Sequence, residues 1–428
     1  MKTGSQPMAR RSLRIGSAIA AGGLLTACGL SVPGGSGPGG GSSGGSGDVQ
    51  VGALVSLTGT AAVFGAQALA GIQTGVYAVN HAGGLWNGRK LHINVADDAS
   101  DPVDTVPAAH KLVDVTHVAF EDGDAGAEAQ ASAPVFSAAQ VPDMMPGGDT
   151  YFDTNKDPYI WRLSPSDSQL GVAMALWAHH LGYTKAAGLF IQNDVAQALG
   201  PVISKQFVKL GGTMTSDQAV QPDLPTYNSE ISKLLAGHPQ VIFSEADPPT
   251  ESVFFKDLRA AGVSTLPTIG TDDMVANSML KAISIPAAMK LMTNVQAGTY
   301  QSPAVGIFNQ LTQAATHKPV QSGAYNTYDG IVIAALAEDA SHAITGPKMN
   351  AEIPKITAPG GTPVYSYAQG KAALAKGKRI TYIGASGPFY FNAFHNVFGP
   401  FVVVRATSAG NYQNIYSISA SALKAATG

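Results

Sequence analysis

The chain has a single cysteine, Cys28, and few charged side chains, which make up 13% of its 428 residues. One cysteine excludes an internal disulfide and any metal site built from several thiolates. The formal net charge is −3, and no basic stripe is present, so nothing favours nucleic-acid binding. After the N-terminal region, no apolar run is long enough to predict a membrane-spanning helix.

Sequence signatures of catalysis are also missing. The chain has no Gly-x-Ser-x-Gly at a strand end, no phosphate-binding loop with Gly-Lys-Ser/Thr and no His-Glu-x-x-His. Asp97, Asp98 and Asp101 together resemble a metal cluster, but we expect a solvated turn because carboxylates are mostly exposed. We therefore predict a binding protein without enzymatic activity, cofactor or metal.

The N-terminus has the parts of a secretory signal in order. Arg10, Arg11 and Arg14 precede a short apolar stretch, 15–25, and a small residue stands just before Cys28. This pattern predicts a lipoprotein with residues 1–28 as the signal peptide and modified cysteine, and with a lipid on Cys28 as the membrane anchor. The alternatives are a buried cysteine in an unprocessed N-terminus and, for the export route, a twin-arginine signal.

A segment rich in Gly, Ser and Pro, residues 29–47, follows the cysteine. Such a composition cannot bury enough apolar surface to offset its ordering entropy, so we expect a flexible linker. The remainder, from about Asp48 to Gly428, has the length of two domains. Its apolar content supports well-built cores, because 45% of the whole chain is hydrophobic.

Strand-like and helix-like patterns alternate along this remainder, which predicts α/β lobes with parallel sheets covered by helices on both faces. After Pro388 the pattern changes to strands and turns. The expected strands are 49–57, 90–96, 118–120, 186–191, 213–219, 241–244, 266–269, 389–391, 400–404 and 412–418, and the expected helices are 61–80, 104–115, 169–181, 195–210, 227–235 and 251–261.

An ordered set of short motifs covers nearly all of residues 49–417. The motifs are Val51–Gly59, Phe64-Gly65, Gly71, Gly83-Gly84, Asn87-Gly88-Arg89-Lys90, Asp97-Asp98 through Asp101-Pro102, Val141-Pro142, Trp161-Arg162, Ala260-Ala261-Gly262 and Gly384–Pro388. No single motif is strong, but the set resembles the Leu/Ile/Val-type periplasmic binding proteins, the substrate-capturing subunits of ABC importers.

The resemblance implies the two-lobed type I periplasmic binding protein fold, with a parallel-sheet αβα sandwich in each lobe and three hinge crossings. It places lobe 1 at 48–161 plus 298–398, and lobe 2 at 162–297 plus 399–428. Trp161-Arg162 would mark the first crossing. Ligand would bind between the lobes, beyond the carboxyl ends of the strands, and draw them together.

Four ligand-binding residues follow from the resemblance in lobe 1. Phe64 matches an aromatic that lines the ligand side chain, and the alternative is packing at a helix start. Gly148 and Thr150 belong to a turn that holds the ligand carboxylate, and a plain turn is the alternative for Thr150. Tyr325, at the start of a long helix, is a fourth candidate.

In lobe 2, Asp272 matches the acid that faces the ligand ammonium group, and the alternative is an N-cap for a helix starting near Met274. Three other positions depart from the family pattern. Ala127 of lobe 1 replaces a serine, Val195 replaces a tyrosine, and Asp247 replaces an aromatic residue. Asp247, with Glu245 close by, would serve a polar or cationic ligand group, and a solvated acidic loop is the alternative.

These observations predict an extracytoplasmic solute-binding lipoprotein of an ABC importer. Its expected partners are a small ligand such as an amino acid or an analogue, the permease subunits, and the membrane through the lipid on Cys28. We expect no nucleic-acid partner and a monomer at the outer face of the cytoplasmic membrane. The alternative is a membrane-tethered sensor of an amide, urea or an amino-acid derivative that signals to a partner protein.

Overall fold

The computed structural model describes residues 47–263, 265–275, 291–298, 300, 302–320 and 323–427. The predicted signal peptide, Cys28 and all but the last residue of the predicted linker lie outside the described residues. Two large sheets organise the described part of the chain, and each has its own buried apolar core.

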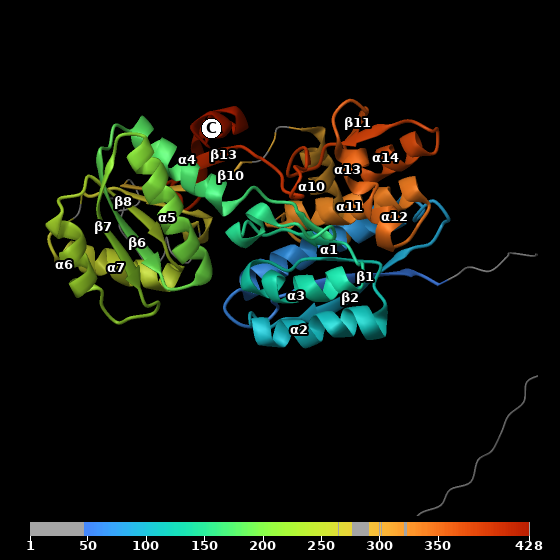
Figure 1. Cartoon of the computed structure of the whole chain (residues 1–428), viewed down its shortest axis with the longest axis horizontal. Helices are drawn as coiled ribbons and strands as arrows, with labels where there is room; N and C mark the ends of the chain where they lie inside the picture. The colour runs from blue at the N-terminus through green and yellow to red at the C-terminus, as the bar shows by residue number, and fades with distance from the viewer. Residues whose placement is uncertain are drawn as a thin grey trace, which may run out of the picture. The chain divides into compact units, whose positions relative to one another are not determined.

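The first sheet has five strands in the order β2-β1-β3-β4-β5, and all of its pairs are parallel. It is drawn in blue to green in Figure 1. Central β1 is almost wholly buried, as its near-continuous apolar sequence predicts for a strand covered on both faces. The strands are β1 Val49–Val55, β2 Leu91–Asp97, β3 Phe120–Asp122, β4 Asp143–Met145 and β5 Ile160–Arg162.

Helices from two distant parts of the sequence cover this sheet (Figure 1). From the first part come α1 Ala62–His81, α2 Pro102–His110, the π-helical turn η1 Lys111–Thr116, α3 Gly126–Ala138 and the 3-10 turn η2 Thr150–Thr154. From the second come α10 Pro303–Thr316, α11 Ala324–Ser341, α12 Gly346–Asn350, α13 Ile353–Thr357 and α14 Tyr367–Leu374, with the two-stranded sheet β11 Thr362–Val364 and β12 Ile380–Tyr382.

Helices α1 and α11 pack closely through glycines. A Cβ at Gly75 would lie 2.6 Å from the Cβ of Ile331, and one at Gly71 would lie 2.3 Å from the carbonyl oxygen of Ala324. Within the described residues, α1 is the one helix long and apolar enough to cross a membrane. Half of it is buried here, because it forms part of the core of the first lobe.

The second sheet has seven strands in the order β14-β13-β10-β9-β8-β6-β7. Its strands are β6 Lys185–Ile191, β7 Thr213–Val220, β8 Val241–Glu245, β9 Thr268–Gly270, β10 Met292–Ala297, β13 Phe401–Ala406 and β14 Tyr412–Ile418. The accompanying helices are α4 Asp167–His180, α5 Asp194–Lys209, α6 Asn228–Ala236, α7 Pro248–Ala260, the 3-10 turn η3 Asp272–Met274 and α15 Ala420–Thr427.

The predicted two-lobed α/β fold is confirmed, with corrections in detail. The second sheet is not wholly parallel, because β13 pairs with β10 and β14 in antiparallel fashion. The strand expected at 389–391 is wrong: the Phe391 N–H donates to the Phe389 carbonyl in a tight turn. The helix expected at 104–115 changes to π-helical geometry at Lys111, and the strand expected at 118–120 spans Phe120–Asp122.

The chain passes between the first lobe, built on the five-stranded sheet, and the second lobe, built on the seven-stranded sheet, three times. The crossings run from β5 to α4, from β10 to α10 and from β12 to β13. Arg162 still pairs with Met145 in the first sheet, so the boundary expected between 161 and 162 falls inside β5. The crossing that follows is short, because α4 begins at Asp167 and packs in the core of the second lobe.

Candidate functional site

Seven of the eight predicted ligand-binding residues follow a parallel strand at its carboxyl end. Phe64 follows β1, Ala127 follows β3, and Gly148 and Thr150 follow β4, all in the first lobe. The other three come after β6, β8 and β9 in the second lobe, and are Val195, Asp247 and Asp272. Open parallel sheets bind ligands at this edge, because loops and helix N-termini present unpaired N–H groups there.

Phe64 and Ala127 both lie in the first turn of a helix. Phe64 is 55% exposed and belongs to the first turn of α1, within the helix expected at 61–80. Ala127 is the second residue of α3 and is half-buried. No side chain caps this helix at Ala125, so its first-turn N–H groups are available to an anion.

The turn after β4 is held in place by Asp149. One of its carboxylate oxygens accepts the Tyr151 N–H at 2.9 Å, and the other accepts the amide of Gln130 at 2.5 Å. These bonds fix the start of η2, where Thr150 is the first residue. Gly148 and Thr150 are both half-buried, next to the end of β4.

In the second lobe, Asp247 is the N-cap of α7, and its carboxylate accepts the Thr250 N–H at 2.8 Å. The alternative of a solvated acidic loop is excluded for Glu245. That residue ends β8 inside the sheet and is 2% exposed. Burial, together with the nearby Asp273 carboxylate, raises the pKa of Glu245 well above its ordinary value. Val195 is half-buried in the first turn of α5.

Asp272 begins the 3-10 turn η3 immediately after β9 and Thr271. The N-cap position of η3 is Thr271, so Asp272 is not the N-cap of this turn. Its side chain is exposed, yet desolvation and the adjacent Asp273 carboxylate raise its pKa.

Asp167, which the sequence did not single out, lies between predicted residues of both lobes. Its N–H donates to the Gly148 carbonyl at 2.7 Å. Burial raises the pKa of Asp167 to about 8, the carboxylates of Asp272 and Asp149 add to that shift, and the Arg162 guanidinium opposes it. Acids of both lobes therefore act on this carboxyl group, which favours a ligand group of positive charge.

A second unforeseen feature is the buried Arg162. Its guanidinium pairs with Asp153 of η2 at 2.8 Å and donates to the Asp149 carbonyl at 2.8 Å. Asp153 also accepts the hydroxyls of Ser166 and Ser168 at 2.5 and 2.6 Å. The network joins η2 to the start of α4 across the first crossing. In the sequence, the one sign of this network was Ser166, a residue type typical of the N-cap position that it occupies in α4.

Tyr325 comes from α11 and lies apart from the strand ends. Its ring centroid is 4.7 Å from that of Phe308 in α10, and the side chain packs against the core of the first lobe. Burial raises the pKa of its phenol. These contacts account for Tyr325 as a packing residue, and a ligand contact stays a prediction.

The turn at Asp97, Asp98 and Asp101 organises the loop after β1. Asp97 accepts the N–H groups of Leu57 and Thr58, and Asp101 caps α2. Asp97 and Asp101 are exposed, as expected for a solvated turn, whereas Asp98 is 1% exposed and is the exception. It is buried because it accepts hydrogen bonds from Ser56 and Ser100.

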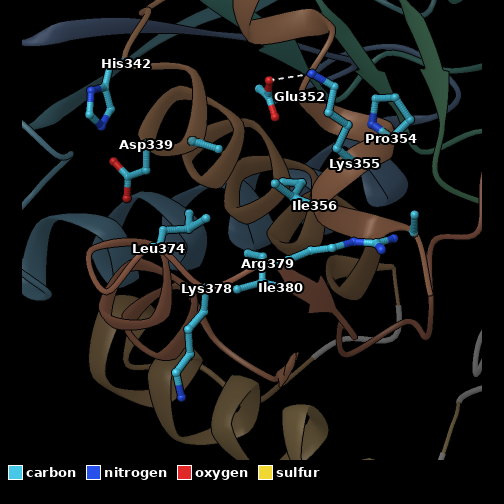
Figure 2. Close-up of a pocket in the computed structure, with 13 residues that line it drawn as sticks. Asp339, His342, Glu352, Pro354, Lys355, Ile356, Leu374, Lys378, Arg379 and Ile380 are labelled. Carbon is cyan, nitrogen blue, oxygen red and sulfur yellow. Dashed lines mark hydrogen bonds and ion pairs between the residues drawn. The ribbon is translucent and has the colours of Figure 1, made fainter. Parts of the chain in front are cut away.

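A cavity of about 670 Å³ lies elsewhere in the first lobe, beside the end of α11 and the elements from α13 to β12. Figure 2 shows Asp339, His342, Arg379 and the Lys355–Glu352 ion pair around it. None of the eight predicted ligand-binding residues lines this cavity. The cavity and the strand-end site are therefore separate features.

Comparisons with known proteins agree with this fold. The sequence model of the periplasmic binding protein family matches residues 48–411. Leu/Ile/Val-binding protein homolog 1 of Brucella abortus (strain 2308) is 26% identical over 300 residues, which are 69% of this chain and 79% of that protein.

Solved structures also match. The leucine binding protein LivK from Thermotoga maritima MSB8 has a TM-score of 0.72 at 18% identity and covers 87% of this chain and 99% of its own. A solute binding protein from R. palustris in complex with 4-hydroxybenzoate has a TM-score of 0.70 at 19% identity. The match covers 87% of this chain and 97% of that protein. At these identities the structures support the fold alone, and the chain belongs, by its family match, to the periplasmic binding protein family of extracytoplasmic solute-binding proteins.

Proposed function

We propose that the chain captures a small solute carrying both an ammonium group and a carboxylate, such as an amino acid or an amino-acid derivative, for an ABC importer. The observation that carries the proposal is the direct contact between the lobes at Gly148 and Asp167, beside Asp149 after β4 and Asp272 after β9. A cluster of carboxylates at the strand ends attracts a cation, and a ligand that neutralises it would hold the lobes together.

The carboxylate of the ligand would bind at the start of α3 and in the turn after β4. The uncapped N–H groups near Ala127 and the hydroxyl of Thr150 are the donors. Asp272 would accept hydrogen bonds from the ammonium group. Leu/Ile/Val specificity is not part of the proposal, because Ala127, Val195 and Asp247 lack the hydroxyls and the aromatic ring found in those binders.

The names of related proteins fit this class. One relative is a Leu/Ile/Val-binding protein homologue, and one structural neighbour is a leucine binding protein. The neighbour in complex with 4-hydroxybenzoate holds a carboxylate ligand that has no ammonium group. An aromatic acid is therefore the informative competitor in a binding test.

A thermal-shift screen followed by calorimetric titration tests the proposal. Each amino acid is paired with the analogue that lacks its ammonium group, and 4-hydroxybenzoate and urea complete the panel. We expect an amino acid to raise the melting temperature by stabilising the folded form, and its des-amino analogue to raise it much less. Equal binding of an acid and its amino counterpart would contradict the proposal.

We further propose that Cys28 carries a lipid and anchors the chain to the outer face of the cytoplasmic membrane, with permease subunits as partners. The support is the order of basic, apolar and small residues before Cys28. The flexible linker predicted after Cys28 would let the folded lobes reach a permease.

A further inference from the structure

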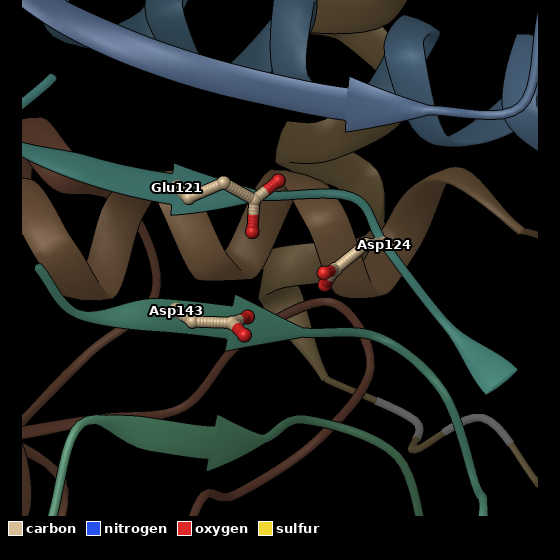
Figure 3. A group of neighbouring side chains, drawn as sticks. All are labelled: Glu121, Asp124 and Asp143. Carbon is tan, nitrogen blue, oxygen red and sulfur yellow. The ribbon is translucent and has the colours of Figure 1, made fainter. Parts of the chain in front are cut away.

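Three carboxylates converge inside the first lobe, below the strand ends. Glu121 lies in β3, Asp124 follows β3, and Asp143 lies in β4 (Figure 3). Glu121 and Asp143 are direct partners in the parallel β3–β4 register, so their side chains lie on the same face of the sheet. One oxygen from each of the three groups lies within 4.8 Å of the others, and all three residues are at most 1% exposed.

Four oxygens of this cluster accept no hydrogen bond from an N–H or hydroxyl group. They are Oδ1 and Oδ2 of Asp143, Oδ1 of Asp124 and Oε2 of Glu121. The other two are used: Glu121 Oε1 accepts the Leu54 N–H at 3.0 Å, and Asp124 Oδ2 accepts the Ser132 hydroxyl. Among the described residues, no Lys, Arg or His forms an ion pair with any of the three.

Asp143 is the most informative member of the cluster. No N–H or hydroxyl group donates to either of its oxygens although the side chain is fully buried, and its carboxyl group is in hydrogen-bonding contact only with the carboxyl groups of Glu121 and Asp124 (Figure 3). An isolated carboxylate cannot be buried without a compensating partner, since the loss of hydration costs several kcal/mol at least. The site therefore needs positive charge, supplied either by a metal ion or by protons.

The donor set matches a hard cation. All the free atoms are carboxylate oxygens, which Ca²⁺, Mg²⁺ and Mn²⁺ prefer, and no nitrogen or sulfur ligand that would favour Zn²⁺ or copper is among them. Two oxygens that each lie 2.3–2.6 Å from one Ca²⁺ can be at most about 5 Å apart. The spacing within 4.8 Å meets that limit.

We propose that Glu121, Asp124 and Asp143 form a buried binding site for a hard divalent cation, with Asp143 able to offer both of its oxygens. Cation binding at this site is a property additional to the proposed capture of a solute. The cation would join β4 to the segment between β3 and α3, three residues before Ala127. It would thus stabilise the loop that carries the proposed carboxylate-binding N–H groups.

The test uses the full-length chain, treated with a chelator and then given CaCl₂, MgCl₂ or MnCl₂ separately. We expect at least one of the three cations to raise the melting temperature in a concentration-dependent manner, because it binds the folded form. Equilibrium dialysis should find one bound cation per chain. If none of the three cations binds, the proposal is overturned, and protons hold the cluster together instead.

Asp143→Asn separates the site from general salt effects. Without cation, this variant should be at least as stable as the parent, because the substitution removes a buried, unpartnered charge. The cation-dependent rise in melting temperature should disappear. A rise equal to that of the parent would overturn the assignment. If Asp143→Asn does not fold, Glu121→Gln replaces it in the same test, with the same expected loss of the cation response.

Asp122→Asn is the matched control. Asp122 is also fully buried, and both of its oxygens lack a partner. Successive residues of a strand point to opposite faces, and a Cβ at Gly330 of α11 would lie 2.2 Å from Asp122 Oδ2. Asp122 thus faces away from the cluster, and this variant should keep the cation response. Loss of the response in Asp122→Asn as well as in Asp143→Asn would contradict a three-residue site.

Discussion

Asp167 donates its N–H to the carbonyl of Gly148 at 2.7 Å, and a Cβ at position 148 would lie 2.3 Å from Asp167 Oδ1. The contact joins the turn after β4 in the first lobe to the first turn of α4 in the second. A side chain at position 148 would force the Asp167 carboxylate to move. The proposed site is therefore assembled at a point where both lobes meet through backbone atoms.

Gly148→Ala should destabilise the protein, because its methyl group collides with the Asp167 carboxylate. We expect a loss of about 1–3 kcal/mol in the free energy of unfolding, as for other overpacked positions. Urea unfolding of Gly148→Ala, Asp167→Ala and the double variant forms a mutant cycle. The double variant should recover part of the loss, and purely additive effects would contradict a direct collision.

The Arg162–Asp153 pair should contribute far more to stability than a surface pair. Asp153→Asn leaves the guanidinium buried without its counterion, and the expected loss is about 3 kcal/mol, the low end for such pairs because Asp153 is 28% exposed. Glu352→Gln is the control, since Lys355 is 64% exposed, and should cost at most about 1 kcal/mol. Equal losses in urea unfolding would show that the network does not hold the crossing.

Asp272→Asn should weaken binding of an ammonium-bearing ligand. Loss of a charge-assisted bond costs about 2–5 kcal/mol, which corresponds to roughly 30-fold or more in Kd. Asp273→Asn, which alters the exposed neighbouring acid, is the control in calorimetric titration and should have a smaller effect. Unchanged affinity in Asp272→Asn would rule out the ammonium contact.

The carboxylate end of the ligand has its own test. Thr150→Val should cost about 1–2 kcal/mol of binding free energy, because one neutral donor is lost while backbone N–H groups remain. Ala127→Ser supplies a hydroxyl at the first turn of α3 and should tighten binding of the same ligand. If both variants bind with the affinity of the parent, the ligand carboxylate does not lie at this helix.

The buried carboxyl group of Glu251 should make the stability of the protein depend on pH. The residue is fully buried in α7, one oxygen accepts the Ser244 hydroxyl at 3.0 Å, and burial raises its pKa from 4.5 to about 8. A raised pKa means that its contribution to stability is complete below about pH 4.5 and is lost as the pH rises through about 8. Urea unfolding from pH 5 to 8 should show a smaller decline for Glu251→Gln than for the parent. Identical slopes would contradict the shift.

Lipidation at Cys28 predicts a defined mature chain. Mass spectrometry of the membrane-extracted protein should find an N-terminus at Cys28 with the mass of a lipid added. Cys28→Ala should be released from the membrane or remain uncleaved, because the thioether cannot form. A Cys28→Ala protein that is processed normally and stays on the membrane would disprove the anchor.

Only part of the site could be predicted from the sequence. The candidate residues after β1, β3, β4, β6, β8 and β9 were predicted from the resemblance to the Leu/Ile/Val-type family, and the structure places them beyond the carboxyl ends of parallel strands. Asp167 and Arg162 were missed as site residues, because their roles depend on contacts with Gly148 and Asp153 across a crossing. For Glu245 the sequence left a ligand role and a solvated loop both open, because a carboxylate is rarely buried in a strand, and its burial in β8 excludes the solvated loop.

The sequence by itself determined the alternation of strands and helices, the two α/β lobes and the family, since these rest on local periodicity and on ordered motifs. Only the tertiary structure decided which acids are buried and which lie close together. Glu121 and Asp143 are 22 positions apart, yet the β3–β4 register makes them neighbours. Burial and carboxylate clustering are set by strand pairing between distant segments, and short-range pattern carries no information about that pairing.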